Sequence, residues 1–194
     1  MSADVLSVLA IDAGNTRIKC GLFRVEPQAT RALPECSGEW AFDTGAAVTP
    51  ETIGVTDSAI PAIITGSNPA EVDRIVSQWP ETAPQPLRLP DRDSLPLAID
   101  VDYPEKVGID RLLNAIAANR IRSENEPVIL IDSGTATTID YVNTEGAFCG
   151  GAILPGFDLC AKALNEYTAL LPLIPMHELL ARESLPDEVG RNTE

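Results

Sequence analysis

The stretch Ile11-Asp12-Ala13-Gly14-Asn15-Thr16 decides the fold, because it joins two runs of opposite character. Residues 5–12 before it are almost wholly apolar, whereas residues 17–22 after it alternate between polar or small side chains and apolar ones. An apolar strand, a tight turn and an alternating strand are typical of a β-hairpin. We therefore predict a hairpin whose turn holds Asp12, Gly14, Asn15 and Thr16.

A second copy of this pattern occurs later in the chain. Residues 127–132 form a short apolar run, residues 133–136 read Ser-Gly-Thr-Ala, and residues 137–142 are rich in β-branched side chains. The two copies align as Asp-x-Gly, with Asp132 matching Asp12 and Gly134 matching Gly14. A duplicated hairpin predicts two similar lobes that face each other, which we assign to residues 1–107 and 108–194.

Further elements fit an α/β chain. Residues 59–64 read as a strand, and Asn68, Pro69 and Glu71 supply an N-cap, a first-turn proline and an N3 glutamate for a helix through Trp79. Apolar residues recur at helical spacing from Gly108 to residue 121, a strand is predicted through residue 153, and residues 157–171 read as a helix.

Composition excludes several classes of function. The 194 residues carry a net charge of −15 with no basic cluster, which disfavours binding to nucleic acid or to an anionic membrane. Four cysteines without Cys-x-x-Cys spacing and the absence of a signal peptide predict a cytoplasmic location. The single histidine, His177, rules out a multi-histidine metal site or a Ser-His-Asp triad.

The two turns could bind a polyphosphate between them. An aspartate that ends a strand just before a glycine turn places a carboxylate for hydrated Mg²⁺ beside outward-pointing backbone N–H groups. Each turn alone is more typical of an ordinary hairpin with an Asx turn, but the duplication and the hydroxyls of Thr16, Thr135 and Thr137 favour phosphate binding. Asp110 is the best candidate for a catalytic carboxylate, with Arg111 next to it for an anionic substrate, although Asp110 could also be a plain N-cap. Walker and Rossmann glycine motifs are absent.

Taken together, the motifs resemble those of type III pantothenate kinases. The resemblance is carried, in order, by residues 12–16, by Gly108-Ile109-Asp110-Arg111, by residues 132–140 and by Gly151-Ala152-Ile153-Leu154-Pro155-Gly156, and it continues to residues 190–193. It implies a two-lobed actin-like (ribonuclease H-like) kinase that phosphorylates pantothenate with ATP, the first step of coenzyme A synthesis. It also implies a homodimer and a need for K⁺ or NH₄⁺.

The resemblance further implies a role for each matching residue. Asp110 would be the base, Asp12 would organise Mg²⁺, and Asp132 would serve the monovalent cation. The phosphates of ATP would be held by Gly14, Asn15, Thr16, Gly134, Thr135 and Thr137. Pantothenate would be bound by Gly108, Ile109, Arg111, Tyr103 and, across the dimer, Thr193.

Two departures from the family pattern leave alternatives open. Val101 stands where the family often has a tyrosine, the nearby tyrosine being Tyr103, and the sequence ends at Glu194, where family members usually continue, so the second lobe is expected to be truncated. The alternatives are a non-catalytic regulatory relative, like the Bvg accessory factor proteins, and an actin-like kinase for another small alcohol.

Overall fold

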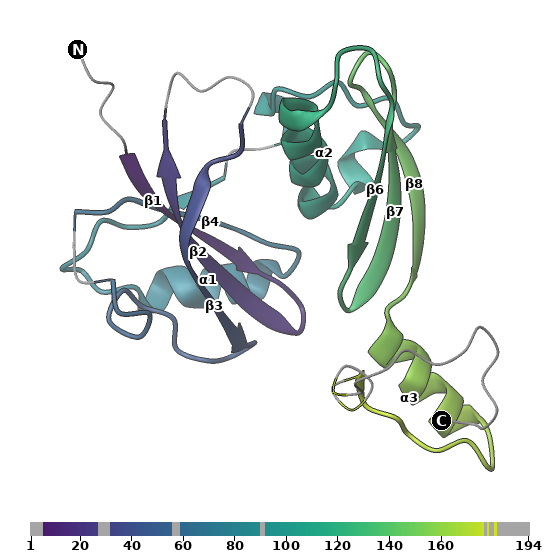
Figure 1. Ribbon diagram of the computed structural model, residues 1–194. Coiled ribbons are helices and arrows are strands. Elements are labelled where there is room, and N and C mark those ends of the chain that lie inside the picture. Colours follow the sequence, from purple (N-terminus) through teal and green to yellow (C-terminus); the bar gives the residue numbers. More distant parts are fainter. Residues whose placement is uncertain are drawn as a thin grey trace.

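The described part of the chain contains two β-sheets and the helices α1, α2 and α3, an α/β architecture with one mixed sheet (Figure 1). The computed structural model describes residues 6–26, 32–55, 59–89, 92–176, 178 and 181. Within these ranges no helix is long and apolar enough to cross a membrane.

The first sheet has five strands in the order β3-β2-β1-β4-β5. Its strands are β1 (Leu6–Ala13), β2 (Arg17–Val25), β3 (Glu35–Asp43), β4 (Ala62–Thr65) and β5 (Leu87–Arg88). Strands β1, β2 and β3 pair antiparallel, and β4 lies parallel to both β1 and β5. The predicted first hairpin is therefore confirmed.

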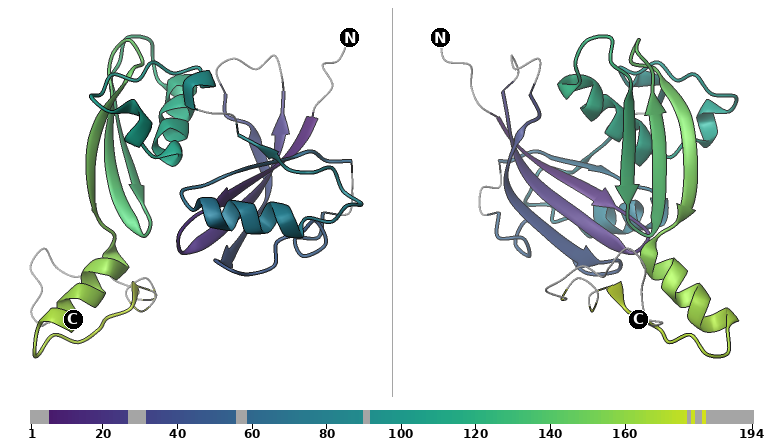
Figure 2. Two further views of the ribbon diagram at one scale, coloured as in Figure 1. Left: turned by 180° about the vertical axis from the view of Figure 1, so that it is seen from behind. Right: turned by 45° about the vertical axis from the view of Figure 1, so that its right-hand side comes forward.

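One face of this sheet is covered by α1 (Pro69–Gln78), as Figure 2 shows. Alternate residues of β1 point into the core against this helix, so that Leu9, Ile11 and Ala13 are buried with Ile75 of α1. Asp12, between Ile11 and Ala13, consequently lies on the opposite face. The predicted cap is confirmed, because the Asn68 side chain accepts a hydrogen bond from the backbone N–H of Glu71 at 3.2 Å.

The second sheet has three antiparallel strands, β6 (Val128–Ser133), β7 (Ala136–Val142) and β8 (Phe148–Pro155). The second hairpin is thus confirmed as well. The helix α2 (Ile109–Ile121) packs on one face, with Leu112 and Ala115 buried against Val142 and Phe148. Two short 3₁₀ helices, Arg92–Ser94 and Pro104–Lys106, precede it.

Residues 95–101 pack on this second core rather than on the first. Leu95, Leu97, Ile99 and Val101 contact the second cluster, and Ile99 forms a parallel bridge with Phe148. These residues precede the boundary predicted at 107/108, yet they pack with the second unit. The boundary itself stays a prediction.

The other face of the second sheet is not covered by any described element. Ile129, Ile131, Ile139, Tyr141 and Leu154 are exposed there, and α3 (Phe157–Tyr167) projects away from the sheet (Figures 1 and 2). The helix predicted over residues 157–171 ends earlier, at Tyr167. In the first sheet β1 lies between β2 and β4, whereas β6, its counterpart, has only β7 beside it in the described chain.

Candidate functional site

The turns of the two hairpins lie side by side (Figure 1). The hydroxyl oxygens of Thr16 and Thr135, one from each turn, are 2.6 Å apart and share a hydrogen bond. Residues 119 positions apart in the chain therefore meet at one point. Any ligand held by both turns would contact both sheets.

A cleft of about 770 Å³ opens beside this point, between the first sheet and α2. The first sheet contributes Asp12, Lys19 and Thr65 to its lining, and β6 contributes Asp132. Asp110 lines the same cleft from the first turn of α2. The structure thus brings together the three aspartates that the sequence singled out.

The cleft is electrostatically unbalanced toward negative charge. Burial raises the pKa of Asp12, the nearby Lys19 ammonium lowers it, and the Asp110 and Asp132 carboxylates raise it again. The sum of these effects is a pKa above the ordinary value. The Asp12 carboxylate accepts no hydrogen bond from the described residues. A cation bound in the cleft would therefore neutralise the negative charge of this carboxylate.

The backbone of the two turns offers fewer free N–H groups than expected. The N–H of Gly14 bonds to the Arg17 carbonyl at 3.0 Å, and the N–H of Gly134 bonds to the Ala136 carbonyl at 2.9 Å. The N–H groups of Asn15, Thr16 and Thr135 have no partner among the described residues. The N–H groups that could bind an anion therefore belong to the residues after each glycine, namely Asn15 and Thr16 in the first turn and Thr135 in the second.

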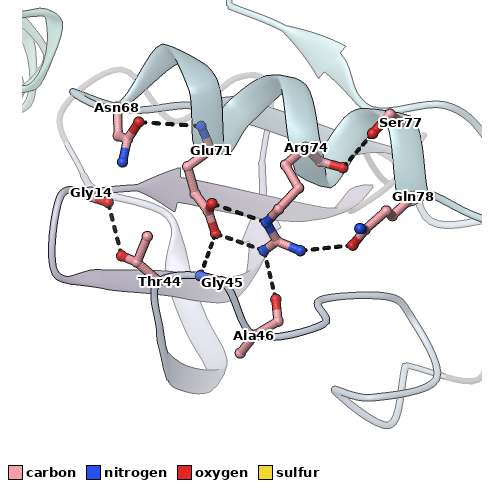
Figure 3. Close-up of polar contacts among 9 residues, drawn as sticks. All are labelled: Gly14, Thr44, Gly45, Ala46, Asn68, Glu71, Arg74, Ser77 and Gln78. Atoms are coloured by element: carbon pink, nitrogen blue, oxygen red, sulfur yellow. Dashed lines mark hydrogen bonds and ion pairs between the residues drawn. The ribbon is translucent and has the colours of Figure 1, made fainter.

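The first turn is held from behind by a polar network (Figure 3). The Thr44 hydroxyl donates to the Gly14 carbonyl at 3.2 Å, and the next residue, Gly45, donates its N–H to the Glu71 carboxylate at 2.9 Å. Glu71 also accepts hydrogen bonds from the Arg74 guanidinium at 3.0 and 2.6 Å. In a capping box the Glu71 carboxylate would accept a hydrogen bond from the backbone N–H of the N-cap residue, Asn68. Here it binds the loop at Gly45 instead, and this loop supports the first turn.

The Arg74 hydrogen bonds have a clear effect on Glu71, which is only 6% exposed. They lower its pKa; burial opposes them, and the Gly45 N–H adds to the lowering, so the pKa lies below its ordinary value. Glu71 is therefore ionised in the folded protein at neutral pH, and the support of the first turn depends on that charge.

Asp110 is the second residue of α2 and not its N-cap, which is Gly108. Its Oδ1 accepts a hydrogen bond from the Arg111 N–H at 2.9 Å. A Cβ on Gly108 would lie 2.5 Å from this Oδ1, closer than non-bonded atoms approach. Gly108 therefore leaves the space that the Asp110 carboxylate occupies.

Arg111 is turned toward the second sheet. Its guanidinium pairs with the carboxylate of Asp140 on β7 and lies over the Phe148 ring, 5.4 Å from the centroid. Arg111 does not line the cleft.

The other predicted residues are distributed as follows. Gly14, Asn15, Thr16, Gly134 and Thr135 form the two turns, and Ile109 lines the cleft. Thr137 shares a sheet face with Ser133, to which it is hydrogen-bonded at 3.1 Å, and hence lies on the face opposite Asp132. Tyr103 is 59% exposed, with Lys106 over its ring, and does not line the cleft. Thr193 and His177 lie outside the described residues.

Four residues near the site were given no role by the sequence, although Thr138 and Asp140 lie within the motif of residues 132–140. Lys19 pairs with Asp12 across the first hairpin, a register that follows from the three-residue loop of residues 14–16. Asn114, one helical turn after Asp110, donates to Asp132 Oδ2 at 3.3 Å. Thr138 pairs with Asp132 and has a buried hydroxyl without a partner among the described residues. Asp140 lies two residues further along the same face.

The donor chemistry fits the cations that an ATP-dependent enzyme uses. No group of three His, Cys, Asp or Glu side chains within the described ranges could enclose a metal. Mg²⁺ is commonly held by one or two carboxylates together with substrate phosphates and water, and the unpartnered Asp12 carboxylate meets that need. The orphaned Thr138 hydroxyl beside Asp132 offers oxygen ligands for a second cation.

Comparison with known proteins gives a consistent result. The sequence profile of the type III pantothenate kinase family matches residues 8–194. A type III pantothenate kinase of Persephonella marina is 33% identical over 195 residues, which covers 96% of this chain and 72% of that protein. One from Rhodospirillum rubrum is 34% identical over 182 residues, covering 86% of this chain and 66% of that protein.

A solved structure of a Ppx/GppA family protein from Aquifex aeolicus is less similar. It shares 12% identity with a TM-score of 0.46, over 91% of this chain and 59% of that chain.

Proposed function

The chain belongs to the type III pantothenate kinase family, and on this premise we propose that it transfers the γ-phosphoryl group of ATP to the primary hydroxyl of pantothenate. The observation that supports this most is the meeting of Asp12, Asp110 and Asp132 in one cleft beside the two joined turns. The chain spans 72% and 66% of the two relatives' lengths, so the activity of the whole protein is a proposal for this chain.

In the proposed reaction Asp110 accepts the proton of the alcohol. The alcohol oxygen forms a bond to the γ-phosphorus, the bond from that phosphorus to the β,γ-bridging oxygen breaks, and ADP leaves. Phosphoryl transfer has a loose transition state, so positioning and charge stabilisation contribute more than a strong base. The free N–H groups of Asn15, Thr16 and Thr135 would donate to phosphate oxygens from both sides of the cleft.

Cations and further residues complete this proposal. Asp12 would hold Mg²⁺, which when bound neutralises part of the phosphate charge. Asp132, with the Thr138 hydroxyl, would hold K⁺ or NH₄⁺. Lys19 lines the cleft, and its positive charge would attract the phosphates of ATP. Pantothenate would approach Asp110 along Gly108 and Ile109, with Arg111, Tyr103 and Thr193 as further predicted contacts.

We also propose that the two units are the lobes of an actin-like (ribonuclease H-like) fold. The duplicated hairpins and the strand order of the first sheet support this. The uncovered face of the second sheet supports a second lobe that is smaller than in the relatives. A homodimer and a cytoplasmic location remain proposals that rest on the family.

Release of ADP in a coupled assay, with pantothenate, Mg²⁺ and K⁺, tests the proposed activity. We expect pantothenate-dependent ADP release in the wild type, and a loss of about 100-fold or more in kcat in Asp110→Asn with ATP binding retained. Near-normal turnover of the variant would reject the role of Asp110.

The same assay decides between the alternatives. Turnover with other small primary alcohols, but not with pantothenate, would identify a kinase for another substrate. ATP binding without turnover of any alcohol would identify a non-catalytic relative.

A further inference from the structure

A buried ion pair anchors the first turn of α2 to the second sheet. Asp140, at the centre of β7, is 1% exposed and accepts hydrogen bonds from Arg111 Nε at 3.0 Å to Oδ1 and 3.2 Å to Oδ2. Arg111 Nη2 also bonds to Oδ1, and the Arg111 side chain is 12% exposed. Both charges are thus largely removed from water, and each is compensated mainly by the other.

The neighbouring residues leave space for this pair. A Cβ on Gly151 of β8 would lie 2.7 Å from Asp140 Oδ1 and would overlap the backbone of β7. The Phe148 ring covers the guanidinium from the other side. A buried ion pair is weak evidence for stability, because apolar residues of similar volume often replace one at no cost. Its function is therefore to be sought in what it positions.

The pair connects the elements that carry two of the three aspartates. Arg111 directly follows Asp110, and its N–H donates to the Asp110 carboxylate. Asp140 lies on the sheet face that also carries Thr138 and its β6 partner Asp132. Among the described residues, no other side chain of the first turn of α2 is hydrogen-bonded to this sheet.

We propose that Asp140 is a positioning residue that acts through Arg111 to fix the Asp110 carboxylate relative to Asp132 across the cleft. This inference rests on the proposed function, because the position of Asp110 matters to catalysis only if Asp110 receives the proton. Asp140 would orient Arg111, and Gly151 would leave space for the Asp140 carboxylate; the sequence motifs that contain these two residues do not indicate either role.

The test compares Asp140→Asn with Val142→Ala. The asparagine keeps the shape of the side chain but removes the charge that orients Arg111. Val142 is buried two residues along the same strand and makes no polar side-chain contact, so its truncation loosens the same core without touching the pair. We expect kcat to fall about 10- to 100-fold in Asp140→Asn, with the KM for ATP within about twofold. The kcat of Val142→Ala should stay within about threefold of the wild type well below its Tm.

A double variant separates positioning from folding. Replacing both partners, as Arg111→Met with Asp140→Leu, should restore the Tm lost in Asp140→Asn because no buried charge is left unpaired, while kcat stays low. In an Arg111→Met background, Asp140→Asn should cause no further loss in kcat if Asp140 acts only through Arg111. Independent, multiplying losses would overturn the inference, as would equal kcat losses in Asp140→Asn and Val142→Ala.

Hydrogen exchange gives a readout that needs no turnover. Amide exchange in a peptide covering residues 108–113 should accelerate in Asp140→Asn more than in the rest of the second unit, and should not do so selectively in Val142→Ala. Unchanged exchange there would overturn the inference even in an active enzyme. A wild type that phosphorylates no alcohol would reject the proposed function, whereas the exchange experiment would still decide whether Asp140 holds the turn.

Discussion

Gly108→Ala is the sharpest test of how the structure places its proposed base. The new Cβ would lie 2.5 Å from Asp110 Oδ1. Non-bonded atoms are separated by about 3.5 Å at contact, so the carboxylate must move by about 1 Å. The backbone at Gly108 has φ −61° and ψ 139°, which alanine adopts without strain. The substitution therefore displaces the carboxylate while leaving its charge and the fold in place.

A misplacement of about 1 Å in a catalytic group can cost on the order of 100-fold in rate. We expect kcat for pantothenate phosphorylation to fall by about 10- to 100-fold, while the affinity for ATP, measured by calorimetry, changes little. Replacing the N-cap glycine by alanine should reduce the free energy of unfolding by about 1 kcal/mol.

The matched control is Ile75→Val, in α1. Ile75 is 1% exposed in the first core, so the loss of one methylene group should also cost about 1 kcal/mol, and this core lies on the face of the first sheet opposite the cleft. Urea denaturation of both variants checks that their stabilities match. Wild-type kcat in Gly108→Ala, or equal kcat losses in the two variants, would refute the proposed placement of Asp110.

Three further predictions concern other parts of the molecule. Glu71→Gln should lower the free energy of unfolding by about 1 to 2 kcal/mol at pH 7, measured by denaturant titration, because it removes the charge that pairs with Arg74, which is 25% exposed and keeps its hydrogen bonds to Gln78 and to the Ala46 carbonyl. The pKa of Glu71 is lowered in the folded state, so its full contribution to stability is present above the unfolded pKa of about 4.3. That contribution is lost as the pH falls through the folded pKa, and the stabilities of the variant and the wild type should therefore converge in acid. Thr135→Val removes the hydrogen bond to Thr16 and should weaken ATP binding, read by calorimetry, with a stability change of about 1 kcal/mol or less. Ile131→Lys, at a position 69% exposed, should reduce self-association in light scattering without lowering the Tm.

Local patterns predicted the hairpins and the helices α1, α2 and α3, although α3 ends at Tyr167 rather than at residue 171. Alternation and turn residues define each hairpin within about 20 residues, and the cap at Asn68 fixes where α1 begins. These elements could be predicted because neighbours in sequence determine their structure. The family resemblance of the motifs is confirmed by the match over residues 8–194.

Contacts between distant residues could not be predicted in the same way. The two turns were expected to be equivalent, yet the first has a three-residue loop, residues 14–16, and the second a two-residue loop, residues 134–135. Glu71 was predicted only as the N3 residue of its helix, but its carboxylate bonds to Gly45, 26 residues away. Asp140 was part of a recognised motif, but its partner Arg111 is 29 residues distant.

The motif glycines gain a physical meaning only from these distant contacts. Gly108 gives space to the Asp110 carboxylate, Gly151 gives space to Asp140, and a Cβ on Gly156 would overlap the carbonyls of the second turn. The hairpin turns are built locally, whereas the proposed position of Asp110 depends on the ion pair between Arg111 of α2 and Asp140 of β7. Loss of that pair should therefore lower kcat while nucleotide binding at the turns persists, and a separation of these two properties is the signature by which variants of the pair can be recognised.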